Sequence, residues 1–394
     1  MSSGIANLPL PVFVNDADEL DPNLILADML AAYQTQTGRT LQPAQVERLI
    51  INLIAYRESL VRNQIQYTGQ QNLLAFATGV MLDYIAQRFA ITRLAAQAAT
   101  VTIQFTLNGA LTVPYTIPAG TMVGSQDGNT AWSTTIPLVI PAGNTTGSVS
   151  AQCTVGGAPG NGYVPGQISV LLTPNALIAS VQNTDESGGT GETPGESPET
   201  DDHLRERIQL APNQSAVAGP VNAYRFFALG VDPSIIDAQV VSPNPGAVAV
   251  YLLTGPITQP AASPNNAGIA GSPLLSKALS VLSADDVRPL TDTVSALAVT
   301  EIDYVITATV TLFADADPTT VQAAVQQAAQ LFAVNLASRI QRNIVKSQIA
   351  SALSVEGVYE VALSAPSADV ALTAGQWANC TAITLTFNTS SESS

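Results

Sequence analysis

One histidine, two cysteines and a glycine-rich stretch are the parts of this sequence whose residue types could do chemistry. His203, the sole histidine, lies in DDHLRERI between two acids and two arginines, where the first turn of a helix is expected. A serine or cysteine triad would have to be built on it, but no nucleophile signature such as G-x-S-x-G accompanies it. Cys153, Cys380 and His203 are not spaced as zinc ligands. We therefore expect an exposed helical histidine, no catalytic residue, no metal site and no cofactor.

The glycine-rich stretch GGAPGNGYVPGQI, residues 156–168, invites comparison with phosphate-binding loops. Gly157 and Gly162 have the separation of a P-loop, but Tyr163 and Val164 stand where that loop needs Lys and Ser or Thr. The dinucleotide spacing G-x-G-x-x-G also fails, and the flanking segments have the alternation of strands. The stretch is therefore predicted to be a turn whose glycines adopt positive backbone angles as a strand leaves its sheet.

The chain is strongly acidic, since 30 acidic and 14 basic residues give a net charge of −16. Such a balance repels phosphate backbones unless a local basic cluster overrides it. The densest basic stretch, Arg339 to Lys346, alternates with apolar residues and is expected on one solvated helix face. We expect no nucleic acid partner.

The apolar runs and the cysteines indicate the cellular compartment in which the protein is expected. No uninterrupted apolar run approaches the roughly 18 residues that span a bilayer, so no membrane insertion is expected. No Lys or Arg precedes Arg39, which argues against a secretory signal. The protein is expected to be made and kept in a cytoplasm, where its two cysteines are expected as buried or half-buried thiols instead of a disulfide.

The region from Asp21 to about Ala90 has the apolar period of helices. Asp21-Pro22 reads as an N-cap followed by proline at the first helical position, and a second helix is expected from about Gln42. Each buried Leu or Ile contributes about 1.5 to 3 kcal/mol. The apolar stripe of this helix therefore either lies against the neighbouring helices or packs against another chain, and three helices can hide only part of it. The stripe consists of Val46, Leu49, Leu53, Tyr56 and Leu60.

From about Gln97 to Val181 the apolar period changes to two, with short runs such as VTIQFTL separated by turns such as Asn108-Gly109. Connections this short fit only antiparallel sheet, so a small β-sandwich or barrel is predicted.

The stretch Thr184 to Asp202 is acidic and has no aliphatic residue, which is typical of a solvated linker. Its oxygen donors also suggest a calcium site, but the regular ligand pattern with a closing Glu is absent. We predict a hinge at its glycines, namely Gly188, Gly189, Gly191 and Gly195.

The remaining chain mixes both periods, which predicts helices laid on mostly antiparallel sheets. The fold class is therefore α+β and multi-domain. We expect a helical region over residues 1–95, a β domain over 96–183, a linker over 184–202, and an α+β region over 203–394 in two sub-blocks, 203–292 and 293–394.

The order of several motifs carries a family resemblance. IPAGT (117–121), DGNTAW, a second IPAG and the glycine-rich stretch lead to SGGTGETPGESPETDDHLRERI. After them come AVAGPVNAYRFFALGV, SPNPGAVAVYLL, DVRPLTDTV and VEGVYEVALSAPSADVALTAGQ. In this order they resemble the baseplate J family of contractile phage tails and related injection particles, from about Pro22 to Phe387.

The resemblance implies a non-enzymatic wedge protein of a virion baseplate, assembled in the host bacterial cytoplasm. Such proteins pair with one another and with a second wedge protein to give a six-fold ring around the central hub, near the sheath-proximal baseplate proteins. The ring widens when the sheath contracts. By position, the helical stripe would join a wedge bundle, and ring contacts would include Arg288, Leu290 and Val358. Two departures could alter which neighbours are reached: the long linker and the insertion Gly255 to Pro273.

Two other function classes stay open at this point. A receptor-binding or carbohydrate-binding tail protein would use the β region and would need an exposed aromatic cleft around Trp132 or Tyr163. A cell-wall hydrolase would need two distinguished carboxylates, and none of the 30 is marked as special.

Overall fold

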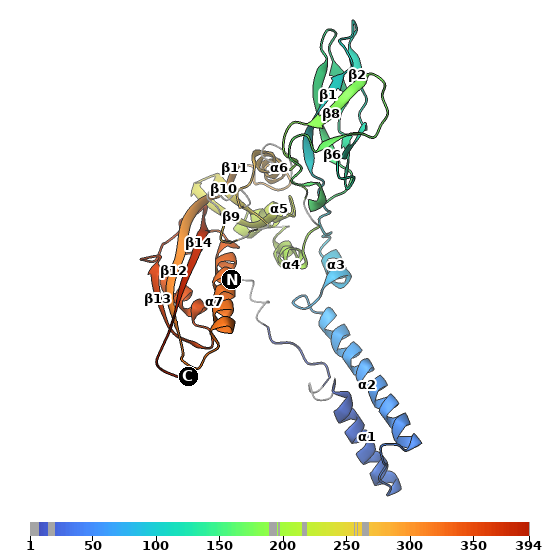
Figure 1. The fold of residues 1–394 in the computed structure, drawn as a ribbon, viewed down its shortest axis with the longest axis vertical. Coiled ribbons are helices and arrows are strands. Elements are labelled where there is room, and N and C mark those ends of the chain that lie inside the picture. Colours follow the sequence, from blue (N-terminus) through green and yellow to red (C-terminus); the bar gives the residue numbers. More distant parts are fainter. Residues whose placement is uncertain are drawn as a thin grey trace. The chain divides into compact units, whose positions relative to one another are not determined.

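Figure 1 shows the fold in a computed structural model, which describes residues 8–14, 20–188, 195, 198–214, 219–255, 257, 259–261 and 268–393. Contacts divide the chain into two units, Met1–Arg93 with Asp201–Gln209, and Leu94–Thr200 with Leu210–Ser394. Among the described residues, no helix combines the length and the apolar character that crossing a bilayer requires.

The first unit consists of helices. α1 (Pro22–Thr37) begins where the Asp21 carboxylate accepts the N–H of Asn23, and it ends at Gly38, whose φ is 68°. The predicted N-cap is therefore confirmed. α2 (Val46–Gln71) lies beside α1, and α3 (Gly79–Gln87) follows it (Figure 1). The unit is completed by α4 (Asp201–Leu210), which the sequence assigned to the region after the linker.

Two arginines attach α4 to the helices that precede it in sequence. Arg205 donates from Nε to the carbonyl of Leu74 and from a terminal nitrogen to that of Ala77, both at 2.9 Å. Arg93 pairs with Asp201 at 2.7 Å. These contacts hold α4 in the helical unit, although the β domain lies between α3 and α4 in the sequence.

The β domain opens the second unit. Its six-stranded sheet has the order β7-β3-β4-β6-β1-β8, with a separate pair β2-β5, and every strand pairing in it is antiparallel. β1 alternates strictly between buried and half-buried side chains, as its sequence predicts. The edge strands β7 and β8 also contact one another, so the sheet curls almost closed. The strands are β1 (Thr100–Leu107), β2 (Tyr115–Ile117), β3 (Met122–Ser125), β4 (Ala131–Thr134), β5 (Leu138–Ile140), β6 (Thr146–Cys153), β7 (Ile168–Leu171) and β8 (Ile178–Asn183).

Residues 210–298, here called the central module, place two helices against a sheet of order β11-β10-β9. β9 and β10 form a hairpin, whereas β10 and β11 are parallel because α6 connects them. The elements are α5 (Val221–Leu229), β9 (Ile235–Asn244), β10 (Ala247–Thr254), α6 (Ser272–Leu282) and β11 (Thr293–Ala298).

Residues 299–393, the C-terminal module, repeat this design with a sheet of order β13-β12-β14 (Figure 1). β12 and β14 are parallel, and Val325, Ala329 and Ala333 of α7 are buried with the sheet side chains in one core. The residues from 338 to 345 connect α7 to α8, so the predicted solvated helix face from Arg339 to Lys346 is wrong. The elements are β12 (Thr300–Leu312), α7 (Pro318–Ala337), α8 (Lys346–Leu353), β13 (Val358–Ala365) and β14 (Gln376–Thr389). The α+β multi-domain class is confirmed.

Candidate interaction surfaces

Helix α2 turns its apolar side to solvent in the part of the chain that the structure describes. The five residues of the predicted stripe keep between 43% and 68% of their surface exposed. Ile50, Ile54, Val61, Ile65 and Tyr67 add to the same exposed set. Ten large apolar side chains on one helix are far more than the scattered exposed residues of an ordinary surface.

The opposite side of α2 is small and polar, yet it is the side that packs. Ala55 and Ser59 are buried, and Arg62 pairs with Glu58 on the same side. Farther along, the side chain of Gln66 bonds the N–H of Phe13 at 2.8 Å and the carbonyl of Pro11 at 2.6 Å. These positions and the apolar stripe lie on opposite faces of α2 at 3.6 residues per turn. In the described structure, the contacts within the chain therefore use the polar face and leave the apolar face exposed.

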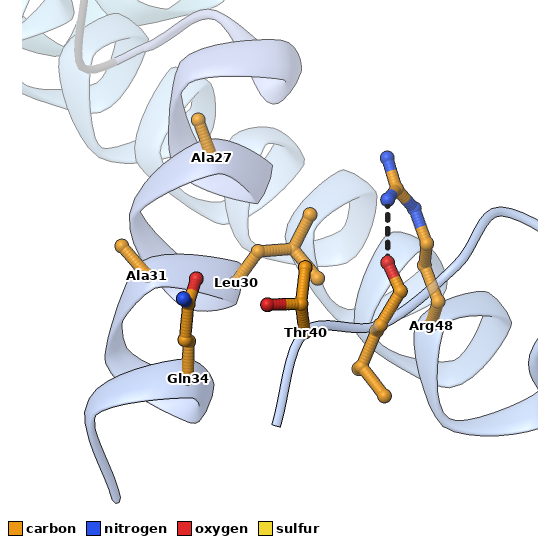
Figure 2. Close-up of a pocket in the computed structure, with 7 residues that line it drawn as sticks. Ala27, Leu30, Ala31, Gln34, Thr40 and Arg48 are labelled. Carbon is orange, nitrogen blue, oxygen red and sulfur yellow. Dashed lines mark hydrogen bonds between the residues drawn. The ribbon is translucent and has the colours of Figure 1, made fainter. Parts of the chain in front are cut away.

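A hollow of about 260 Å³ lies between α1 and the start of α2, as Figure 2 shows. Its volume is below the roughly 300 to 1,000 Å³ of ligand pockets. The Arg48 guanidinium already donates to the carbonyl of Leu41 at 3.0 Å. The other side chains offer methyl groups, a hydroxyl and an amide, so this hollow holds no acid, base or nucleophile. It is lined by Ala27, Leu30, Ala31, Gln34, Thr40, Leu41 and Arg48.

The residues predicted for ring contacts lie in two different modules. Leu290, in the connection between α6 and β11, is 94% exposed. Arg288 beside it donates to the carbonyls of Ser283 and Asp292 at 2.8 and 3.1 Å, so it holds its own loop. Val358 is half-buried against the core of the C-terminal module. Of the three, only Leu290 presents its whole side chain.

The predicted hinge glycines are partly tied to the β domain. Gly188 donates its N–H to the carbonyl of Thr100 at 3.1 Å. Gly195 exchanges two hydrogen bonds with the side chain of Asn161, at 2.6 and 2.9 Å, and a Cβ there would lie 2.2 Å from the carbonyl oxygen of Gly157. Gly189 and Gly191 lie outside the described residues. Part of the linker therefore packs on the glycine-rich turn.

That turn is itself organised by Asn183, a residue that the sequence analysis did not single out. Gly157, Gly162 and Gly166 have φ values of 101°, 80° and 86°, which confirms the predicted positive angles. The buried Asn183 donates to the carbonyls of Tyr163, Val164 and Asp185, and its Oδ1 accepts the N–H of Ile168. A lone Asn at the end of a strand carries no signal of this role in the sequence.

The residues with potential chemistry are dispersed in the described structure. His203 is only 9% exposed, so the prediction of an exposed histidine is wrong. Cys153 and Cys380 are both free and buried, as predicted. No group of three His, Cys, Asp or Glu side chains among the described residues could hold a metal ion.

The aromatic residues of the β domain do not line a cleft. Trp132 is fully buried, and the half-buried ring of Tyr163 meets it edge-on with centroids 6.3 Å apart. The Trp132 indole N–H bonds to the hydroxyl of Thr130 at 3.2 Å. An exposed aromatic platform for a sugar is therefore not present around these two residues.

The arrangement defines a class: a multi-module protein with an unpartnered apolar helix and no assembled catalytic group among its described residues. Four family models match it in order, namely the Baseplate J-like N-terminal domain (47–100), barrel domain (101–190), central domain (216–298) and C-terminal domain (304–386). The chain belongs to the baseplate J-like family.

One curated relative and one solved structure extend the comparison. Baseplate protein J of Escherichia phage P2 is 34% identical over 183 residues, which are 46% of this chain and 57% of that protein. The cryo-EM structure of the anti-feeding prophage baseplate, six-fold symmetrised, contains a chain with a TM-score of 0.43 and 16% identity. That alignment covers 90% of this chain and 89% of the other.

Proposed function

We propose that this protein is a structural component of the baseplate of a contractile phage tail or a related injection particle, where it acts as a wedge protein without catalytic activity. In this proposal, copies pair with one another and with a second wedge protein, close a six-fold ring around the hub, and transmit the change that triggers sheath contraction. Family membership supports the baseplate role, and the outward apolar face of α2 supports the wedge contact.

The apolar face argues for a permanent partner. Burying one Leu or Ile contributes about 1.5 to 3 kcal/mol, so the ten exposed side chains of α2 represent a large driving force. The occupant we propose is a helix of a neighbouring wedge chain, lying along α2 and covering the stripe centred on Leu53. Such a helix-on-helix contact would also explain why the small and polar side of α2 serves the contacts within its own chain.

The charge of the helical unit permits this packing. The helical unit, residues 1–93 and 201–209, has eight arginines and eleven acids, which gives −3, whereas the whole chain carries −16. Identical chains with a large negative charge repel each other. Of the two units, the helical unit is therefore the one through which copies can meet with less repulsion.

Leu53→Asp tests the wedge contact. The variant should fold normally, because Leu53 is 63% exposed in the single chain, but it should lose co-purification with its wedge partners, both a tagged second copy of the chain and the second wedge protein. Leu331→Asp, at a position 60% exposed on α7, is the matched control and should keep the partner. Circular dichroism separates misfolding from lost contact. A soluble Leu53→Asp protein that still retains its partner would contradict the proposal.

The linker Thr184 to Asp202 is proposed to act as a hinge in the contraction step. Since Gly188 and Gly195 are bonded to the β domain, we place the bend near the end of the linker, after Glu199. Glu199 itself is held by Leu94: its N–H donates to the carbonyl of Leu94 at 3.1 Å, and its carboxylate accepts the N–H of Leu94 at 2.8 Å. Shortening the linker should impair sheath triggering while leaving the folded modules intact. Unchanged assembly and unchanged triggering in such a variant would count against the hinge.

A further inference from the structure

The central and C-terminal modules hold each other through groups that neither module's hydrophobic pattern reveals. We propose that they form one mechanically rigid body, locked by the buried carboxylate of Asp237 and by a strap, Gln259 to Ala261, that covers the edge of β14. Any rotation of the chain must then take place outside the joint between them. This inference concerns the single chain and does not depend on the baseplate role.

Asp237 is the first fastening. It lies on β9 in the central module and is 6% exposed. Its Oδ1 accepts from Arg225 of the same module at 2.7 Å and from Arg339 of the C-terminal module at 3.2 Å. Its Oδ2 accepts the backbone N–H of Ile340 at 2.9 Å. Separating the modules would break the two bonds to Arg339 and Ile340, one of them charge-assisted, and only the pair with Arg225 would remain.

The strap is the second fastening, and it comes from the insertion after β10. Gln259 is 7% exposed, and its Oε1 accepts the N–H of Cys380 at 2.7 Å while its Nε2 donates to Asn379 at 3.1 Å. The N–H of Ala261 donates to the carbonyl of Cys380 at 2.9 Å. β14 is an edge strand, so its outer backbone groups at Cys380 would otherwise face solvent. A segment of the central module thus bonds both backbone groups of Cys380 on the edge of the other sheet.

An apolar seam lies between these fastenings. Leu253 of the central module is buried in one cluster with Ala337, Ile340 and Trp377 of the C-terminal module. The Trp377 indole N–H donates to the carbonyl of Ala337 at 2.6 Å. The backbone of Gly268 passes so near this ring that a Cβ would lie 2.6 Å from it.

A second close approach lies two residues before Leu253 on β10, at Tyr251. Gly375 donates its N–H to the side chain of Gln239 at 2.7 Å, and a Cβ on Gly375 would lie 2.5 Å from the ring of Tyr251. Two backbone segments packed directly on aromatic rings leave no space for sliding. The family models end at residue 298 and resume at 304, so these contacts join what match as two separate domains.

The test follows hydrogen exchange of the full-length chain along a urea titration, reading β10 for the central module and β12 for the C-terminal module. Asp232→Asn removes contacts that lie within the central module, since Asp232 bonds Lys277 and Ser234 there. If the two modules are one body, the urea midpoint of β12 must fall together with that of β10. The reciprocal substitution is Asn343→Ala, which removes the acceptor of the Leu372 N–H within the C-terminal module. It should lower the urea midpoints of both β12 and β10.

The second arm removes the fastenings with the double variant Asp237→Asn and Gln259→Ala. In that background Asp232→Asn should shift β10 alone, and the population with one module open should rise about tenfold or more. The proposal is overturned if Asp232→Asn and Asn343→Ala each shift only their own module in the otherwise unchanged chain. It is equally overturned if the double variant leaves the two midpoints coupled. If the double variant does not fold, Asp232→Asn and Asn343→Ala in the otherwise unchanged chain still test whether the two modules unfold together.

Discussion

The Oδ1 of Asn183 accepts the backbone N–H of Ile168 at 2.9 Å, which joins the last residue of β8 to the first residue of β7. In the almost closed β domain this side chain takes the place of a strand-to-strand hydrogen bond between the two edges. The same amide donates to three carbonyls of the glycine-rich turn and the linker. One buried side chain therefore sets the closure of the sheet and the course of the chain beyond it.

Replacing Asn183 by Leu should destabilise the β domain by about 3 kcal/mol, because it leaves several buried backbone groups without partners. Urea unfolding, followed through hydrogen exchange of β1 and β6, measures the loss. Gln182→Leu is the control, since Gln182 is the exposed neighbour on the same strand and should change the stability by less than about 0.5 kcal/mol. Equal effects of the two substitutions would show that Asn183 does not organise the turn.

The stability of the helical unit should fall in acid through Asp201. Burial raises the pKa of Asp201, but the N–H of Gly79 and the Arg93 guanidinium lower it more, so the pKa lies below its ordinary value. A carboxyl whose folded pKa is depressed contributes stability above its unfolded pKa, and this contribution disappears as the pH falls through the folded pKa. The loss should therefore occur below about pH 4.

Asp201→Asn should flatten this acid limb, which is measured as the urea midpoint of the helical unit between pH 6 and pH 2.5. The exposed Asp28 on α1 provides the control, and Asp28→Asn should leave the slope as it is. An unaltered slope in the Asp201 variant would mean that the Arg93 and Gly79 contacts do not hold Asp201 ionised.

Gly268→Ala should destabilise the second unit by about 1 to 3 kcal/mol. A Cβ at this position would lie 2.6 Å from the ring of Trp377, which is fully buried and cannot turn aside. Gly109→Ala meets nothing within 4 Å and should be nearly neutral. Chemical unfolding monitored by tryptophan fluorescence compares the two proteins. A neutral Gly268→Ala would show that the ring has room to move.

Several parts of this protein were predictable because their signals are local. The alternation in β1, the Asp21-Pro22 start of α1 and the period of α2 depend on residues within a turn or two of one another. The ordered motifs likewise indicated the family, which four models then matched. The hinge glycines, the interface residues and the domain bounds stay predictions.

Two sequence-based predictions were wrong because burial depends on residues far along the chain. His203 has a polar neighbourhood in sequence, yet α4 lies in the helical unit, where this side chain is buried. Arg339 follows a long helix and reads as solvated, but it meets Asp237, more than a hundred positions earlier, across the joint of two modules. No local pattern reports such distant partners.

The sequence by itself determined the alternation of β1, the start of α1 and the broad apolar stripe of α2, since periodicity follows from backbone geometry. Only the tertiary structure decided which side of α2 faces its own chain, that Asn183 closes the β domain, and that Asp237 locks two modules together. The reason is physical: the free energy of a buried polar group is set by the partners that folding brings to it, and those partners come from distant parts of the chain.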